Sequence, residues 1–145
     1  MIALGCDHGG FKLKEEIKAY LEENNIEYKD FGIYEEKSMD YPDKAFEVCE
    51  EVAAGNFEKA ILICGTGIGI SMAANKVKGI RAALCSDCFS AKYTRLHNDA
   101  NVLCMGGRTL GAGLGIMITD IFLNTEFEGG RHKTRIDKIA AYENK

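Results

Sequence analysis

The sequence lacks the features that would direct it to a nucleic acid, a membrane or an export route. Lys and Arg number 18 against 22 Asp and Glu, and the net charge of −4 argues against a nucleic-acid or anionic-membrane partner. The longest apolar stretch, Leu110–Leu123, contains Asp120 and is too short to span a bilayer. The first residues lack the basic start of a secretory signal. The sequence therefore predicts a cytoplasmic protein with no nucleic-acid or membrane partner.

Disulfides and internal divisions are also not expected. The six cysteines could pair, but without an export signal we expect reduced thiols. The only proline, Pro42, suits the first turn of a helix, and no repeat, linker or low-complexity segment is visible. With 145 residues, 46% hydrophobic and 28% charged, residues 1–145 are predicted to form one domain.

Short apolar runs alternate with amphipathic or glycine-bounded segments along the whole chain. Five strands alternating with helices predict a doubly wound, Rossmann-like parallel sheet with helices on both faces, a three-layer αβα architecture. Ligands of such sheets bind at the carboxyl ends of the strands. Strands are predicted at 1–6, 26–31, 60–63, 82–85 and 102–105, and helices at 11–24, 42–54, 71–77, 87–97, 110–123 and 131–142.

The stretch Ala60–Ile70 carries the strongest chemical signal. An apolar strand ends in Cys64, and alternating glycines then lead into a helix. This arrangement gathers backbone N–H groups and the positive end of a helix dipole around one point. A cysteine at that point is favoured as the thiolate. We therefore expect an anion-binding turn that carries a reactive thiol.

Three better-known glycine-rich motifs do not fit this turn. A dinucleotide fingerprint would need glycine at position 70, and a cysteine phosphatase loop would need arginine there, but the residue is Ile70. A P-loop would need a Gly-Lys-Ser/Thr ending, which is absent. The turn is therefore predicted to serve some other reaction of its thiol.

Further polar residues follow the first and fifth predicted strands. Asp7 and His8 follow the first and Arg108 follows the fifth, so we expect all three at the edge that holds Cys64. An isolated Asp-His pair is more often a capping feature, but its position favours the site. His97 closes a predicted helix. It could belong to the site, or it could simply be a cation that interacts favourably with the helix dipole, and the sequence alone leaves both interpretations open.

Two late arginines share a helix face. Arg131 and Arg135 stand at i and i+4, which commonly gives only a solvated surface. Arg131, however, falls in the first turn, where the dipole disfavours a cation, and two guanidiniums converging on a phosphate would explain that placement. Elsewhere, Cys85 and Cys88 have the spacing of a redox pair or half a zinc site, but no second ligand pair exists, so coincidence is favoured.

Together these residues resemble the ribose-5-phosphate isomerase B family, which includes the galactose-6-phosphate isomerase subunits. The similarity extends over essentially the whole chain and follows the cysteine-type pattern, since relatives without the cysteine have glutamate where this chain has Ile70. The matching motifs are G-C-D-H-G-G at Gly5–Gly10, D-Y-P at Asp40–Pro42, I-L-I-C-G-T-G-I-G-I-S at Ile61–Ser71, A-A-N-K at Ala73–Lys76, R-L-H-N-D-A-N-V-L at Arg95–Leu103, G-G-R at Gly106–Arg108 and G-G-R-H-K-T-R at Gly129–Arg135.

The resemblance implies an aldose–ketose isomerase that acts through a cis-enediolate with no cofactor and no metal. Cys64 would be the base that moves a proton between C1 and C2, with Thr66 moving a proton between the oxygens. His97, with Asp7 nearby, would open the furanose ring. The remaining implied ligands are the N–H groups of Gly65, Gly67 and Gly69 for the enediolate, Asn98 and Tyr41 for sugar oxygens, and His8, Arg108, Arg131 and Arg135 for the phosphate.

The resemblance also implies a homodimer, or a dimer of dimers, whose subunits share each active site through the helix at 131–142. Ribose 5-phosphate and ribulose 5-phosphate are the expected substrates, because one chain holds the whole motif set. The alternatives are a hexose 6-phosphate such as allose or galactose 6-phosphate, and a non-catalytic sugar-phosphate-binding protein. The pair Cys64 and Thr66 argues against the last, since binding alone needs no thiol.

Overall fold

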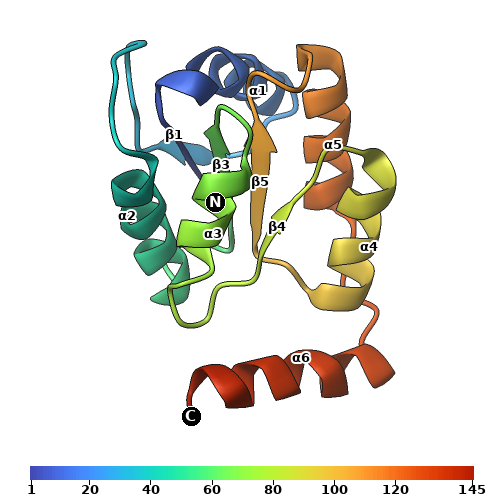
Figure 1. Ribbon diagram of the computed structural model, residues 1–145. Helices are drawn as coiled ribbons and strands as arrows, with labels where there is room; N and C mark the ends of the chain where they lie inside the picture. Colours follow the sequence, from blue (N-terminus) through green and yellow to red (C-terminus); the bar gives the residue numbers. More distant parts are fainter.

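The computed structural model describes the whole chain, Met1–Lys145, and contains a single five-stranded sheet (Figure 1). All strand pairs are parallel, in the order β2-β1-β3-β5-β4, as the sequence predicts. The elements are β1 Ile2–Cys6, a 3₁₀ turn at His8–Gly10, α1 Phe11–Glu23, β2 Tyr28–Asp30, α2 Tyr41–Ala53, β3 Lys59–Cys64, α3 Ile68–Ala74, β4 Ala82–Leu84, α4 Cys88–Asn98, β5 Val102–Gly106, α5 Ala112–Asn124 and α6 Arg131–Glu143.

The strand order creates a switch point between β1 and β3. After β1 the chain crosses to β2 at one edge of the sheet, and after β3 it crosses to β4 at the other edge. The connections after these two neighbouring strands therefore diverge to opposite faces of the sheet. Open α/β sheets bind ligands in the crevice at such a point. The turns after β1 and β3 are therefore the natural location for a site.

Two apolar layers hold the helices to the sheet. One core cluster joins alternate residues of β1, β3 and β5 to α1, α4 and α5, and the other joins the intervening residues to α2 and α3. Because side chains alternate across a strand, the nearly continuous apolar runs of the central strands supply both layers. Cys64 belongs to the layer shared with α2 and α3.

Helix α6 lies outside both layers, beyond the amino ends of the strands (Figure 1). Only His132 and Ile136 of its side chains are buried, while Ile139 and Tyr142 are exposed. A helix held by so few apolar contacts has little tertiary support from its own chain. None of the helices has the length and apolar composition needed to cross a membrane.

The predicted boundaries agree with the structure to within about two residues, apart from one helix. Helix α3 was expected at 71–77 but begins at Ile68, which places Gly69 inside it. Gly67 adopts a left-handed conformation with φ 80°, and the Oγ1 of Thr66 accepts a hydrogen bond from the N–H of Ile68 at 3.2 Å. These two features complete the turn early and bring the helix start closer to Cys64.

A buried lysine of α1 is paired with a carboxylate of the edge strand β2. The ammonium of Lys14 is fully buried and donates hydrogen bonds to both oxygens of Asp30 and to the carbonyl of Ile33. Burial raises the pKa of Asp30, but hydrogen bonds from Lys14, Gly32 and Lys18 outweigh it and hold that pKa below its usual value. Because the folded pKa is the lower one, this carboxylate stabilises the fold at neutral pH and loses that effect as the pH falls through the folded value.

Replacing Lys14 should therefore cost far more stability than replacing the half-buried Lys18, which also pairs with Asp30. Lys14→Met should lower the free energy of unfolding by about 3 kcal/mol, because the carboxylate stays buried with too few donors. Lys18→Met, at a side chain that is 24% exposed, should cost less than about 1 kcal/mol. Urea unfolding at one fixed protein concentration measures both; equal losses would contradict the assigned role of Lys14.

Candidate active site

Three backbone turns meet at the carboxyl edge of the sheet. The N–H of Gly107 donates to the carbonyl of Cys64 at 2.8 Å, and the N–H of Arg108 donates to the carbonyl of Gly65 at 2.9 Å. From the other side, a Cβ added to Gly9 would lie 2.8 Å from the N atom of Gly65. The ends of β1, β3 and β5 thus approach at backbone contact distance.

The turn after β3 holds the thiol of Cys64 against a hydrogen-bond donor. The side chain is only 4% exposed, and the N–H of Gly67 donates to its Sγ at 3.2 Å. Gly67 cannot be another residue, because its φ is 80° and an added Cβ would lie 2.6 Å from Leu84 and 2.7 Å from Met105. The turn therefore supplies a fixed backbone N–H donor to the sulfur of Cys64.

A tyrosine from α2 lies beside this turn. A Cβ on Gly69 would stand 2.6 Å from the hydroxyl oxygen of Tyr41, so the phenol packs directly on the first turn of α3. N–H groups in the first turn of a helix have no partner within the helix. Tyr41 and the free N–H donors of this turn can therefore contact the same small ligand.

The turn after β1 combines a cap with a basic cavity. Asp7 is buried and accepts the N–H of Gly9 at 2.9 Å, so the capping role weighed from the sequence is present. The Nδ1 of His8 accepts the N–H of Met39 at 3.3 Å, which leaves Nε2 as its N–H donor. A cavity of about 250 Å³ opens here, lined by His8, Gly9, Lys12, Glu36, Gly107 and Arg108.

Lys12 is a candidate that the sequence analysis missed. It stands two residues after the Gly9-Gly10 pair, in the first turn of α1, and it lines the same cavity as Arg108. A lysine in the first turn of a helix that begins at the carboxyl edge was the available signal. Two cations without a carboxylate within 4 Å suit an anionic ligand.

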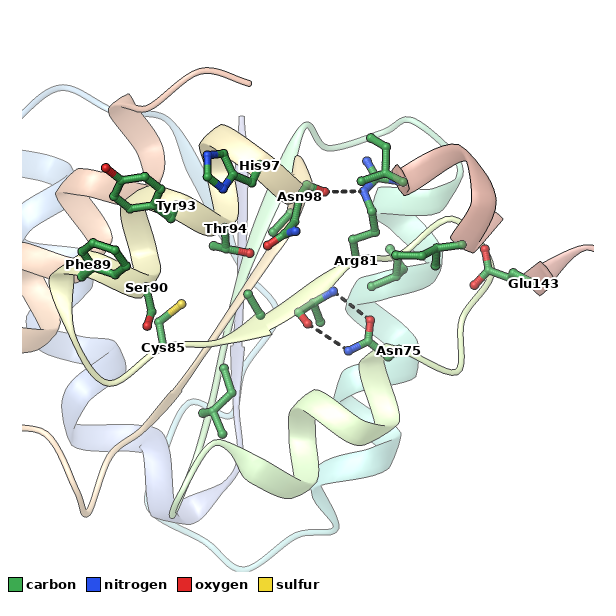
Figure 2. A pocket seen from close by; sticks show the side chains of 17 residues that line it. Asn75, Arg81, Cys85, Phe89, Ser90, Tyr93, Thr94, His97, Asn98 and Glu143 are labelled. Atoms are coloured by element: carbon green, nitrogen blue, oxygen red, sulfur yellow. Dashed lines mark hydrogen bonds between the residues drawn. The ribbon is translucent and has the colours of Figure 1, made fainter. Parts of the chain in front are cut away.

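The predicted residues on α4 lie at the opposite edge. Helix α4 starts after the carboxyl end of β4 and finishes before the amino end of β5, so His97 and Asn98 come to the amino edge of the sheet. There they line a cavity of about 720 Å³ together with Tyr93 of α4 and Ile136 of α6 (Figure 2). The backbone carbonyl of Asn98 accepts a hydrogen bond from the Nε–H of Arg81 at 3.1 Å.

The two late arginines join His97 at this amino edge. Arg131 is the first residue of α6, and Arg135 follows one turn later; both are exposed and neither has an ion-pair partner. His132, between them, is buried, with its ring stacked on that of His97 at a centroid separation of 3.9 Å. Burial, together with the nearby His97 and Arg131, lowers the pKa of His132 below its usual value.

The predicted site residues thus fall into two sets that one chain keeps apart. His97 is not near Asp7 within the chain, contrary to the simplest form of the expectation. The carboxyl-edge set contains Asp7, His8, Tyr41, Cys64, Gly65, Thr66, Gly67, Gly69 and Arg108, and the amino-edge set contains His97, Asn98, Arg131 and Arg135.

The Cys85–Cys88 pair shows no redox site. Both thiols are free, and Cys85 is buried. Burial raises the pKa of the Cys85 thiol to about 11, whereas a reactive redox cysteine needs a lowered pKa. The sequence interpretation of this spacing as a coincidence is consistent with that environment.

An open α/β sheet with a thiol, a hydroxyl and cations at its switch point is the architecture of a small-molecule enzyme. Residues 2–139 match the model of the ribose/galactose isomerase family. Ribose-5-phosphate isomerase B of Escherichia coli is 51% identical over 142 residues, covering 98% of this chain and 95% of that protein. The chain belongs to the ribose/galactose isomerase family.

Solved structures agree with this assignment. Ribose-5-phosphate isomerase B of Clostridium thermocellum superimposes with a TM-score of 0.97 at 49% identity, covering 99% of this chain and 97% of that one. The Mycoplasma genitalium ribose-5-phosphate isomerase B, solved with bound ribulose-5-phosphate, gives a TM-score of 0.95 at 44% identity, covering 99% and 96%. The five-stranded α/β fold is therefore the fold of the family.

The close approach of the three turns can be tested with a pair of glycine substitutions. An added Cβ at Gly107 would overlap the carbonyl oxygen of Gly9, whereas one at Gly113 in α5 meets nothing within 4 Å. Gly107→Ala should lower the free energy of unfolding by about 1–3 kcal/mol. Gly113→Ala should leave it unchanged or raise it by up to about 1 kcal/mol. Thermal or urea unfolding compares them, and a neutral Gly107→Ala would refute the tight packing.

Proposed function

We propose that this chain interconverts ribose 5-phosphate and ribulose 5-phosphate. The observation that carries the proposal is the thiol of Cys64, held by the N–H of Gly67 at the switch point of a chain whose whole length matches ribose-5-phosphate isomerases B. The bound ribulose-5-phosphate of the Mycoplasma genitalium relative supports a pentose phosphate as the ligand.

The proton transfer is assigned to Cys64. Its thiolate removes the proton from C2 of the open-chain aldose, and the electron pair moves through the C1 carbonyl to give a cis-enediolate. The resulting thiol returns the proton to C1. Thr66, an exposed residue two positions after Cys64, moves the remaining proton from O2 to O1, which yields the ketose. No cofactor or metal enters these steps.

The charge that develops on the enediolate needs donors fixed in advance. We assign the N–H groups of Gly65 and Gly69 as the donors for the oxyanion, while the N–H of Gly67, which donates to the Sγ of Cys64, stabilises the thiolate. Tyr41 holds a sugar oxygen, and Asp7 fixes the turn that carries His8. A turn of this design lowers the barrier mainly by stabilising the charge on O1.

The amino-edge set can reach the same substrate only from a second copy of the chain. Strand β3 has six residues and separates the two edges by roughly 20 Å, which exceeds the length of a pentose phosphate. We therefore propose a homodimer in which one subunit supplies Cys64 and the other supplies His97 for ring opening. Asn98 would bind a sugar oxygen there.

The phosphate site in this arrangement is shared as well. Arg131 and Arg135 from one subunit join His8 and Arg108 of the other, which gives four cationic or N–H donors around one dianion. Helix α6, buried in its own chain through only two side chains, packs across the interface with its exposed Ile139 and Tyr142. In a dimer of dimers, two such pairs of subunits would associate.

Removing the thiol should abolish turnover and spare binding. Cys64→Ala should lower kcat for ribose 5-phosphate by at least about 10³-fold, while a phosphate-bearing substrate analogue still binds in calorimetry. Cys88→Ala, at a half-buried cysteine outside both sets, is the matched control and should retain full activity. Full activity of Cys64→Ala would refute the assigned base, and parallel assays on allose 6-phosphate and galactose 6-phosphate would show whether a hexose is preferred.

Mixed dimers test whether two subunits share each site. Cys64→Ala and His97→Asn proteins should each be inactive on the cyclic sugar. After unfolding and refolding together, half of the dimers carry one subunit of each kind and hold one intact site of two. Activity should then recover to about a quarter of the wild-type value. No recovery in refolded mixtures would contradict the shared site.

The phosphate role of α6 predicts an effect on KM. Arg135→Ala removes a charge-assisted contact to the phosphate, so KM should rise by about tenfold or more with a smaller change in kcat. Lys138→Ala removes an exposed cation from the same helix and should leave both constants unchanged. An unchanged KM in Arg135→Ala would remove that residue from the phosphate site.

A further inference from the structure

Two histidines and a glutamate form a cluster at the amino edge, and the proposed isomerase steps use only one of them, His97. His97 lies in the last turn of α4, His132 lies in the first turn of α6, and Glu128 lies in the segment between α5 and α6. One ligand atom from each residue lies within 4.8 Å of the other two. The N–H of Glu128 donates to the carbonyl of Leu96 at 3.0 Å, which holds this segment against the end of α4.

His132 points to a ligand for this cluster. Its side chain is 4% exposed, and its Nε2 is enclosed by protein without any hydrogen-bond partner. It is the only buried side-chain nitrogen or oxygen in the chain in this state. Leaving a buried polar atom unpaired is unfavourable, so a group that is not part of this chain is expected to satisfy it.

From this geometry we infer that His97, Glu128 and His132 form a binding site for a divalent transition-metal ion, of which Zn²⁺ is the best match. Imidazole nitrogens and a carboxylate oxygen are ordinary zinc ligands, and three protein ligands leave the fourth position open. Mg²⁺ and Ca²⁺, which prefer oxygen ligands, fit the set poorly.

The cluster needs a modest rearrangement to bind the ion. Zinc–nitrogen bonds of about 2.0–2.1 Å in a tetrahedral site bring donor atoms to roughly 3.3 Å apart. The carboxylate of Glu128 already stands 3.7 Å from Nε2 of His97. The rings of His97 and His132 are nearly parallel, with an interplanar angle of 12°, so one must tilt. His97 and Glu128, with side chains 35% and 49% exposed, can move toward the fixed His132.

Metal binding at this site would inhibit the isomerase reaction. A zinc ion on His97 occupies the lone pair that ring opening needs, so the metal should inhibit turnover of the cyclic sugar reversibly. This consequence rests on the proposed function, whereas the metal site itself does not. The two statements are therefore tested by different measurements.

Metal binding is measured first without substrate, in phosphate-free buffer. Co²⁺ is the probe, since nitrogen and oxygen ligands give it weak visible bands, whereas any of the six free thiols would add an intense charge-transfer band. We expect one Co²⁺ per chain without that band, displaced by Zn²⁺. Glu128→Gln should weaken binding at least about tenfold, and so should His132→Asn. Glu126→Gln, an exposed carboxylate in the same segment, should not.

Several results would overturn the site. They are an affinity unchanged in Glu128→Gln, a thiolate band in the wild-type spectrum, or equal weakening by Glu126→Gln. Because Glu128 is exposed, its substitution tests the site even if His132→Asn fails to fold. Zinc inhibition of isomerase activity, relieved by a chelator and weaker in Glu128→Gln, is expected next. Metal binding without inhibition would refute only the predicted zinc inhibition. Metal binding by a protein that has no isomerase activity would refute only the proposed function.

Discussion

The close approach of three strand ends is the constraint on which the carboxyl edge depends. The backbones after β1, β3 and β5 come near enough that a single Cβ at Gly9 or Gly107 would overlap a neighbouring main chain. That proximity aligns the carbonyls of Cys64 and Gly65 with the N–H groups of the turn after β5. The backbone of Cys64 is consequently fixed by main-chain contacts, next to the N–H of Gly67 that donates to its Sγ.

The fold could be predicted almost completely, because its signals are local. Apolar runs of four to six residues separated by amphipathic helices specify a parallel sheet covered on both faces. Helix α3 was misplaced because the sequence cannot reveal that Gly67 takes a left-handed conformation and that the hydroxyl of Thr66 accepts a hydrogen bond from the N–H of Ile68. Glycines that look like a loop in the sequence can therefore belong to a helix.

The site was only partly predicted, since a family motif identifies a residue, whereas the sheet edge that it occupies follows from its place relative to the strands. Cys64 and Arg108 follow strands and so had to meet, but His97 ends a helix that runs back across the sheet. Lys12 and Glu128 were missed for a different reason. Each is recognised as a candidate only through neighbours that are distant in sequence. Lys12 lines a cavity with Arg108, and Glu128 lies close to the rings of His97 and His132.

The separation of the two residue sets has a consequence for how such a gene can diverge. On the proposed arrangement each subunit carries two independent half-sites, one built around Cys64 and one around His97. After a gene duplication, one copy could lose its thiol and the other its histidine, and the heterodimer would keep one complete centre. The lost half of each copy would then be free to change, so the fold offers a direct evolutionary route from a symmetric enzyme to an obligate two-gene enzyme.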